Sequence, residues 1–201
     1  MQDFDHPDPF TIPGTDTLRN HLNLTGGELE RVERLHTQIR QEQPLPDLDI
    51  SVLGFRAIHR HLFETVYPWA GEIRTSHTLV KGSASFLHGR FVPDALARQF
   101  DLLAGERNLK TMSPNAFAQR AAFHIGEINY IHPFREGNGR TIRLFLRELA
   151  RQAGHTLKLD RIDRDAWMDA SQESSAQNYQ PMTQVIRGAM LAQAPRRRGS
   201  S

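Results

Sequence analysis

The sequence has no cysteine among its 201 residues, and neither sign of charge is in large excess. Disulfide bonds, thiolate chemistry and cysteine-ligated zinc are therefore excluded, and nothing points to an oxidising compartment. The formal net charge is +2, from 25 basic and 23 acidic residues, which gives no reason to expect direct nucleic-acid binding. The basic run Arg196-Arg197-Arg198 is typical of a solvated terminus.

Long apolar runs are also missing. No stretch approaches the ~20 residues of a membrane-spanning helix, and the polar, proline-rich segment from Met1 to Pro13 does not resemble a secretory signal. We therefore expect a cytoplasmic protein with no membrane partner, with a secreted effector as the alternative. The length suits one domain, and no internal repeat or linker divides the chain.

Several common catalytic patterns are absent from the sequence as well. It contains no Gly-x4-Gly-Lys-Ser/Thr phosphate loop, no His-Glu-x-x-His zinc motif and no Gly-x-Ser-x-Gly nucleophile elbow. These absences argue against a P-loop nucleotidase, a zinc protease of that kind and an α/β-hydrolase.

Helical spacing dominates what is present. One apolar stripe, on a helix of about four turns, is formed by Leu29, Val32, Leu35, His36 and Ile39. A second helix is predicted over 51–66, with Leu53, Ile58, Leu62 and Phe63 facing inward. Further helices are predicted over 93–108, 113–131, 139–153, 163–172 and 179–191. Ser113 is the expected N-cap of its helix, with Pro114 in the first turn.

The fold class that this pattern predicts is all-α, with one exception between residues 69 and 92. Gly71, Gly82 and Gly89 divide that region into short segments typical of a small β-hairpin or flap. We expect an extended lead-in over residues 1–14, one domain over 15–192 and a basic tail over 193–201.

A candidate site for a phosphate ester lies at 132–143, which reads His-Pro-Phe-Arg-Glu-Gly-Asn-Gly-Arg-Thr-Ile-Arg. The turn Gly137-Asn138-Gly139 precedes a predicted helix, so its N–H groups add to the unpaired donors and positive dipole end of the first helical turn. Arg140 and Arg143 lie one turn apart on one face and can reach phosphate oxygens. Arg147 and Arg151 continue the row further from the turn, so we assign them to solvent or to pairing with Glu148.

The residues before the turn suggest a metal ligand and a base. Glu136 would hold Mg²⁺ against bound phosphates, with a capping or salt-bridging role as the alternative. His132 would accept a proton near pH 7, with a core or surface role as the alternative, and Pro133 predicts extended backbone geometry for it. Phe134 is expected to turn inward and anchor the loop.

The segment 132–143 resembles the Fic-domain signature, His-x-Phe-x-Asp/Glu-Gly-Asn-Gly-x-x-Arg, with the usual intervening arginine at Arg140. The segment Tyr67-Pro68-Trp69-Ala70-Gly71-Glu72-Ile73-Arg74, with the later Lys81-Gly82 and Phe86, resembles the region that leads into the family's flap. The resemblance covers about residues 8–190 and implies a compact helical Fic domain with a β-hairpin flap.

The resemblance also implies a reaction, the transfer of AMP from ATP to a Ser, Thr or Tyr hydroxyl of a target protein. His132 would deprotonate the hydroxyl, and Glu136 would hold Mg²⁺ at the α- and β-phosphates. Gly137, Asn138 and Gly139 would form the anion site, with Asn138 on the α-phosphate and with Arg140 and Arg143 on the β- and γ-phosphates. The target would dock on the flap, at Thr78, Leu79, Val80, Lys81, Gly82 and Phe86. The adenine would lie near Asn178 and Tyr179.

The family's variants make two positions informative. A related branch transfers the terminal phosphate and replaces the second glycine, so Gly139 favours AMP transfer. An inhibitory Ser/Thr-x-x-x-Glu helix is also implied, yet no glutamate in this chain has Ser or Thr four residues before it. We therefore expect the toxin of a bacterial toxin–antitoxin pair, with the glutamate on a separate antitoxin and with type II topoisomerase subunits as targets. The alternatives are a catalytically silent binding module and a secreted effector that modifies a host protein.

Overall fold

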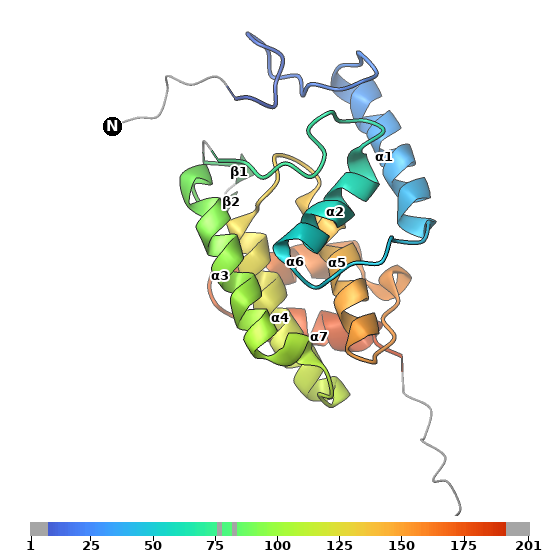
Figure 1. The fold of residues 1–201 in the computed structure, drawn as a ribbon, viewed down its shortest axis with the longest axis vertical. Coiled ribbons are helices and arrows are strands. Elements are labelled where there is room, and N and C mark those ends of the chain that lie inside the picture. The colour runs from blue at the N-terminus through green and yellow to red at the C-terminus, as the bar shows by residue number, and fades with distance from the viewer. Residues whose placement is uncertain (1–7, 76–77, 82–83, 192–201) are drawn as a thin grey trace, which may run out of the picture.

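The computed structural model describes residues 8–75, 78–81 and 84–191, which form a helical bundle with a small hairpin (Figure 1). The α-helices are α1 (Gly26–Glu42), α2 (Val52–Phe63), α3 (Val92–Gly105), α4 (Pro114–Ile131), α5 (Asn138–Gln152), α6 (Arg164–Ser175) and α7 (Gln180–Ala189). The hairpin strands are β1 (Val80–Lys81) and β2 (Ala84–Ser85), and short 3₁₀ turns lie at η1 (Gly89–Phe91), η2 (Arg107–Leu109) and η3 (Leu159–Arg161). The predicted all-α class with a β-hairpin is confirmed. None of the described helices combines the length and the apolar character needed to cross a membrane.

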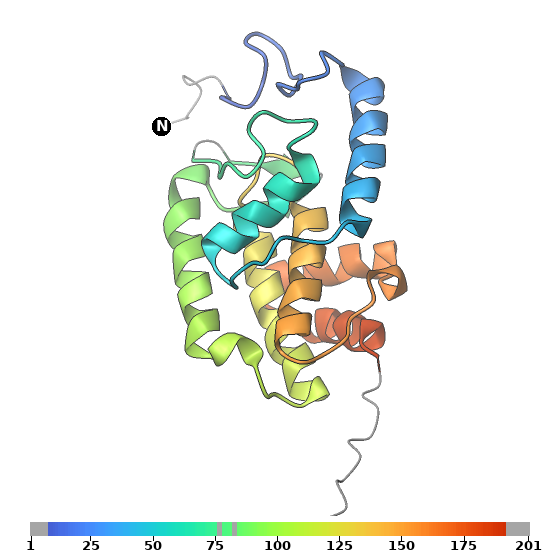
Figure 2. The same cartoon turned by 45° about the vertical axis from the view of Figure 1, so that its right-hand side comes forward.

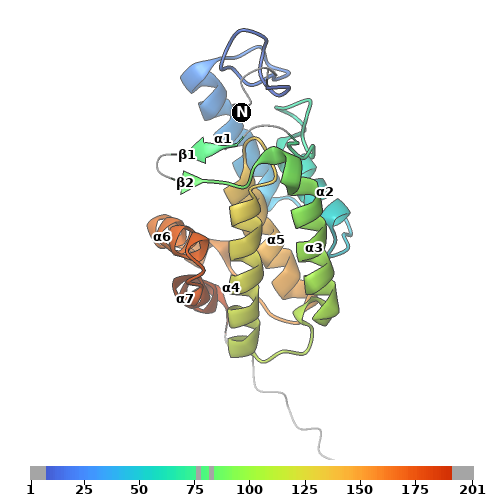
Figure 3. The ribbon, with the colours of Figure 1, turned by 90° about the vertical axis from the view of Figure 1, so that its left-hand side faces the viewer.

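Helix α4 is the centre of the bundle, with α3 on one side and α6 and α7 on the other (Figure 3). It starts as the sequence predicts, because the Ser113 hydroxyl accepts a hydrogen bond from the Ala116 N–H and Pro114 occupies the first turn. Gly126 lets the C-terminal helices approach, since a Cβ there would lie 2.9 Å from both Ser174 and the Tyr179 ring. The C-terminal half of α4 is therefore packed closely against α6 and the start of α7.

The loop between α4 and α5 is fastened to an aromatic core. The ring of Phe55 on α2 lies 5.2 Å from that of Phe145 on α5 and 5.7 Å from that of Phe100 on α3, centroid to centroid. Phe134 of the loop joins them at 5.4 Å from Phe55 and is fully buried, as predicted. Large aromatic side chains contribute much of the apolar area in such a core. The loop is thus part of the bundle interior.

Helix α1 lies at one edge of the molecule (Figure 2), and its predicted inward face is wrong. Leu29 is buried, but Leu35 and Ile39 are 54% and 62% exposed, and the other buried residues are Glu33 and Thr37. The physical reason is that α1 faces Arg140 of α5, so polar partners decide which side is buried. Leu53 at the start of α2 is likewise exposed, although it was expected to face inward.

The segment before α1 packs against the core. Phe10 is buried and meets Trp69 edge to face at 5.3 Å, and its carbonyl accepts a hydrogen bond from the Arg19 N–H. Packed structure therefore begins before residue 15, and residues 8–14 contain turns in addition to extended backbone. Residues 1–7 and the tail over 193–201 lie outside the described residues.

The hairpin stands beyond the C-terminal end of α4 (Figure 3). Val80 pairs with Ser85, and the Phe86 N–H donates to the Leu79 carbonyl at 3.0 Å. At its root, the Leu87 N–H donates to the carbonyl of Tyr130 on α4 at 3.2 Å. The hairpin is thereby tied to the turn of α4 that immediately precedes His132. Gly82, which was assigned to the flap, lies outside the described residues.

Candidate active site

His132 ends α4 in the left-handed conformation, with φ 49° and ψ 62°. The extended geometry predicted from Pro133 is therefore wrong. The helix must stop and reverse at this point, and the His132 N–H still completes the helical bond to the carbonyl of Ile128 at 3.0 Å. The following proline disfavours the right-handed helical region, which leaves the left-handed one available. This conformation is rare for a residue other than glycine, so surrounding contacts must hold it.

Those contacts come from Arg74, whose guanidinium is buried under the loop. Its Nε donates to the His132 carbonyl at 2.7 Å and its Nη2 to the Ile131 carbonyl at 3.0 Å. The same Nη2 reaches the Leu87 carbonyl at the root of the hairpin. Burial and the nearby charge of Arg135 lower the pKa of Arg74 to about 10, so it stays a cation at neutral pH. A cation at the carbonyl end of α4 is also favoured by the helix dipole.

The His132 ring is oriented on both sides. Its Nδ1 lies 3.1 Å from the carbonyl oxygen of Asn129. A carbonyl only accepts, so Nδ1 carries the hydrogen and Nε2 is the basic nitrogen of the neutral imidazole. Phe86 of the hairpin stacks on the ring with centroids 3.6 Å apart and planes 19° apart. The predicted base therefore presents Nε2 in one tautomer, beneath a side chain that the sequence placed in the flap.

His59 and Asn138 hold the middle of the loop. His59 Nδ1 accepts from the Gly71 N–H at 2.8 Å, its Nε2 donates to the Glu136 carbonyl at 3.0 Å, and its ring stacks on Phe134 at 3.9 Å. Burial lowers the pKa of His59 to about 3, so the ring is neutral. The Asn138 side chain both donates to the Phe134 carbonyl and accepts from its N–H, at 2.7 and 2.9 Å. The side chain of Asn138, which was predicted to bind phosphate, thus holds the backbone of the loop at Phe134.

The two glycines of the turn have different reasons for being glycine. Gly137 has φ 80°, and a Cβ there would lie 2.2 Å from the ring of Phe63, so the fold itself requires it. A Cβ on Gly139 would meet nothing closer than a guanidinium nitrogen of Arg143 at 3.6 Å, which is an ordinary contact. The fold therefore leaves open space at Gly139, at the start of α5, where a ligand would approach.

A cavity of about 960 Å³ opens beside the loop, between α1, α5 and the first turn of α6. Its lining combines acidic, basic, neutral polar and a few apolar residues: Asp16, Thr17, Leu18, Gly26, Leu29, Glu30, Glu33, Arg34, Thr37, Gln38, Gln41, Tyr67, Glu136, Arg140, Arg143 and Arg164. Glu136, Arg140 and Arg143 of the predicted site thus meet on one cavity. It has the size and mixed polarity of a small-molecule site.

Glu136 presents a partly exposed carboxylate to this cavity. One carboxylate oxygen accepts from the Gly137 N–H at 2.9 Å and lies 3.8 Å from Arg140. No group of three or more acidic or histidine side chains suited to a metal gathers among the described residues. A single carboxylate fits Mg²⁺, which is often held by one or two carboxylates, waters and substrate phosphates. The residues present therefore fit the predicted metal, whose other ligands would be waters and substrate phosphates.

Arg140 is largely satisfied by the protein. Its guanidinium pairs with Glu33 of α1, donates to the Thr37 hydroxyl at 3.1 Å and lies 4.8 Å from the centre of the Phe63 ring. The Tyr67 hydroxyl donates to the other oxygen of Glu33, and burial with the Glu33 charge raises the pKa of Tyr67. Arg140 was predicted to bind phosphate, and in the structure its side chain also links α5 to α1.

Arg143 differs from Arg140 in having no such partner. Among the described residues, none forms a hydrogen bond or ion pair with its guanidinium, which instead lies 5.6 Å from the ring centre of Trp167 on α6. Burial and the charges of Arg140 and Arg164 lower its pKa. A partly buried cation beside other cations carries a free-energy cost that a bound anion would offset. Arg143 is thus the strongest sign of an anion in this cavity.

The residues predicted for the adenine lie elsewhere on the surface. Asn178 Nδ2 donates to Glu173 at 2.8 Å, and the Tyr179 hydroxyl donates to Glu127 while its ring packs over Gly126. Neither belongs to the described lining of the cavity. Their role in adenine binding stays a prediction.

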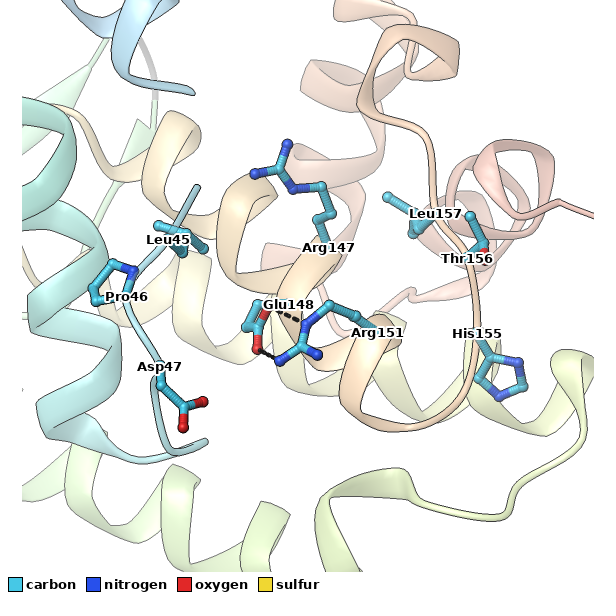
Figure 4. Close-up of a pocket in the computed structure, with 9 residues that line it drawn as sticks. All are labelled: Leu45, Pro46, Asp47, Arg147, Glu148, Arg151, His155, Thr156 and Leu157. Atoms are coloured by element: carbon cyan, nitrogen blue, oxygen red, sulfur yellow. Dashed lines mark hydrogen bonds and ion pairs between the residues drawn. The ribbon is translucent and has the colours of Figure 1, made fainter. Parts of the chain in front are cut away.

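A second cavity, of about 480 Å³, lies at the far end of α5 (Figure 4). Arg151 makes a two-point ion pair with Glu148 there, at 2.8 and 2.6 Å, which confirms the predicted pairing. Arg147 turns to the backbone carbonyl of Gln41 instead. Because its acidic and basic groups largely compensate each other, we assign this cavity no role in the reaction.

Sequence reasoning missed Glu33 and His59, and it named Arg74 only within the segment that leads into the flap, without assigning it a role. Glu33 was overlooked because it falls between the apolar positions of the predicted stripe, and its spacing to Thr37 was the available signal. His59 and Arg74 carried no local signal, since their partners lie 77 and 58 residues away.

Comparison with known proteins places this geometry in a family. A model of the Fic/DOC family matches residues 49–150. The chain is 40% identical over 182 residues to a probable protein adenylyltransferase, y4lH, of Sinorhizobium fredii, covering 90% of this chain and 94% of that protein. It is 38% identical over 185 residues to the protein adenylyltransferase VbhT of Bartonella schoenbuchensis, spanning 90% of this chain but 38% of the longer relative.

A solved structure agrees in fold. The BepC protein of Bartonella tribocorum, a VirB-translocated effector crystallised with AMPPNP, superposes with a TM-score of 0.82 at 25% identity, over 92% of this chain and 97% of that one. The matched region contains the whole loop from His132 to Arg143, together with His59 and Arg74. The geometry of the loop, the buried residues that support it and these comparisons all point to the same family. The chain belongs to the Fic/DOC family.

Proposed function

We propose that the protein transfers AMP from ATP to a Ser, Thr or Tyr hydroxyl of a target protein. It is an enzyme, a protein adenylyltransferase, like the relatives that share 40% and 38% of its aligned residues. The observation that carries the proposal is Arg143, a partly buried cation with no described anionic partner, on the same cavity as Glu136. A polyphosphate would supply the missing charge.

The chemistry follows from the His132 tautomer. Nε2 takes the proton of the target hydroxyl, and the hydroxyl oxygen forms a bond to the α-phosphorus of ATP. The bond between that phosphorus and the oxygen bridging to the β-phosphorus breaks, and pyrophosphate leaves with the electron pair. Positioning and electrostatic stabilisation account for most of such a rate enhancement. Arg74 and Asn129 contribute by holding the ring and its backbone in place.

Glu136 would hold Mg²⁺ against the phosphates, and the metal would neutralise charge on the phosphate oxygens. The backbone N–H groups at the start of α5, next to Gly139, would bind phosphate oxygens together with Arg143. Arg140 is already paired with Glu33, so its contribution to the β-phosphate would include shaping the site. The open space at Gly139 supports AMP transfer over transfer of the terminal phosphate.

The target would dock on the hairpin as an added strand, along Thr78, Leu79 and Val80. Thr78 and Val80 are exposed, and Phe86 of the same hairpin covers His132. A strand bound there would bring its hydroxyl to the base. Lys81 and Gly82 complete the proposed docking segment.

Control by a second protein is also part of the proposal. No glutamate in the sequence has Ser or Thr four residues before it, so an antitoxin would supply the inhibitory glutamate to Arg143. The protein would then act as a toxin in the cytoplasm on type II topoisomerase subunits. The secreted-effector alternative uses the same chemistry on a host protein, and a secretion assay separates it from the toxin.

The experiment is incubation of the protein, ATP and Mg²⁺ with bacterial lysate, using ATP labelled at the α- or the γ-phosphate. We expect α-label, and no γ-label, on a protein band of the size of a topoisomerase subunit. The His132→Ala variant should leave that band unlabelled. Label from γ-labelled ATP alone would indicate a kinase, and an unlabelled lysate with retained toxicity of His132→Ala would indicate a binding module.

A further inference from the structure

Three helices each contribute one arginine without a described partner to the cavity beside the loop. Arg34 comes from α1, Arg143 from α5 and Arg164 from the first turn of α6. Across the described residues, no hydrogen bond or ion pair joins any of these guanidinium groups to an acid. Arg164 lies outside residues 49–150, the part of the chain that the family model matches.

The acidic residues of the same cavity do not compensate this charge. Glu33 is already bound to Arg140 and Tyr67, and Glu136 faces the Gly137 N–H. Asp16 and Glu30 line the cavity without a described ion pair to Arg143 or Arg164. Burial is the largest cause of the lowered pKa of Arg143, and the charges of Arg140 and Arg164 add to it. The cations of the cavity therefore repel one another.

Local helix structure gives no reason for an arginine at 164. Asp163 caps α6 by accepting from the Ala166 N–H at 2.9 Å, and a positive charge in the first turn opposes the helix dipole. Trp167, one turn further along α6, lies under the guanidinium of Arg143 at 5.6 Å. Because residues three apart share a helix face, Arg164 lies on the side of α6 that faces Arg143.

We propose that Arg164 and Arg143 together form the site for the terminal phosphate of ATP. Arg143 would approach this phosphate from α5 and Arg164 from α6, so that two guanidinium groups meet the most highly charged end of the nucleotide. The start of α6 adds its positive dipole end. ADP lacks this phosphate and would not engage Arg164. The inference rests on the proposed function for the nucleotide but assigns a residue outside the loop.

The test is calorimetric titration of the full chain with Mg²⁺-ATP and with Mg²⁺-ADP, comparing Arg164→Gln with the control Arg161→Gln. Arg161 is also exposed and lies in η3, but it does not line the cavity. We expect Arg164→Gln to weaken ATP binding about fivefold, the size of one charge-assisted contact at a solvated site, and to leave ADP binding unchanged. Arg161→Gln should leave both unchanged.

An equal loss for ATP and ADP, or no loss for either, would overturn the assignment. So would a parallel loss in Arg161→Gln, because that would reflect net charge alone. Failure of the proposed function has a separate signature, in which the wild-type protein binds both nucleotides yet transfers no α-label to any protein. The preference of Arg164 for ATP over ADP can be measured in either case.

Discussion

The loop at 132–139 and the cavity wall beside it treat their polar groups in opposite ways. Around the loop, His59, Asn138 and Arg74 form hydrogen bonds to backbone groups at 2.7–3.0 Å. On the wall, Arg143 and Arg164 face the cavity with no described partner. The protein thus fixes the geometry of the loop with its own hydrogen bonds and leaves uncompensated positive charge on the cavity wall where the nucleotide would bind. Preorganised geometry and unpaired charge together are what electrostatic catalysis requires.

The largest expected effect concerns the one loop residue that reacts. His132→Ala should lower the rate of AMP transfer by about 10²–10⁴-fold, the usual contribution of a general base. ATP binding should change little, because His132 does not line the cavity. Rates measured with α-labelled ATP, together with titration calorimetry, check both expectations. A matching loss of ATP affinity would instead place His132 on the nucleotide.

Two arginines with opposite surroundings give the sharpest test of the comparison. Arg74→Met should lower the free energy of unfolding by about 3–5 kcal/mol, because it leaves buried carbonyls at 131 and 132 without donors. Arg143→Met should change it by less than about 1 kcal/mol, since no described bond is lost. Urea unfolding of both variants measures these energies.

The same two variants should also differ in their affinity for ATP. Arg143→Met should weaken ATP binding about tenfold, whereas folded Arg74→Met should keep it. Equal stability losses in the two variants would remove the distinction between loop and wall.

The two glycines offer a smaller version of the same contrast. Gly137→Ala should lower stability by about 2–4 kcal/mol, through the contact with Phe63 and the positive φ. Gly139→Ala should leave it within about 1 kcal/mol, because alanine suits a helix and meets only an ordinary contact. Thermal unfolding compares them, and transfer assays should find Gly139→Ala folded but slower. An active Gly139→Ala would show that no ligand needs this space.

The smallest effect is on pH dependence. The pKa of His59 is lowered from 6.5 to about 3 by burial, so the unfolded chain binds an additional proton between these values. Stability should therefore be full above pH 6.5 and fall as the pH drops, by up to about 1.4 kcal/mol per unit for this residue. His124 and His155, whose pKa values burial also lowers, add in the same direction. Urea unfolding at pH 7, 6 and 5 measures the slope, and a flat profile would contradict a neutral, buried His59.

The sequence predicted the features that residue type and local order reveal. The cap at Ser113 acts within three positions, and the inward Phe134 and the glycine turn are recognisable by residue type although their partners are distant; the structure places all three as expected. The inner face of α1 was not predictable in this way, because Glu33 is buried to meet Arg140, 107 residues later. The left-handed His132 likewise depends on donors from Arg74, 58 residues earlier. Tertiary partners of this kind leave little trace in local periodicity.

The root of the hairpin has a practical consequence for changing what the enzyme modifies. Arg74 and the Leu87–Tyr130 bond hold the second strand side of the hairpin to the end of α4, while the exposed side chains that would meet a target, Thr78 and Val80, lie on the side of the first strand. The exposed side chains of the first strand are thus distinct from the backbone bonds that hold the hairpin beside the base. Exchanging Thr78, Leu79 and Val80 for the corresponding segment of a relative should retarget the protein and keep its chemistry, which would make the first strand of the hairpin an exchangeable specificity segment.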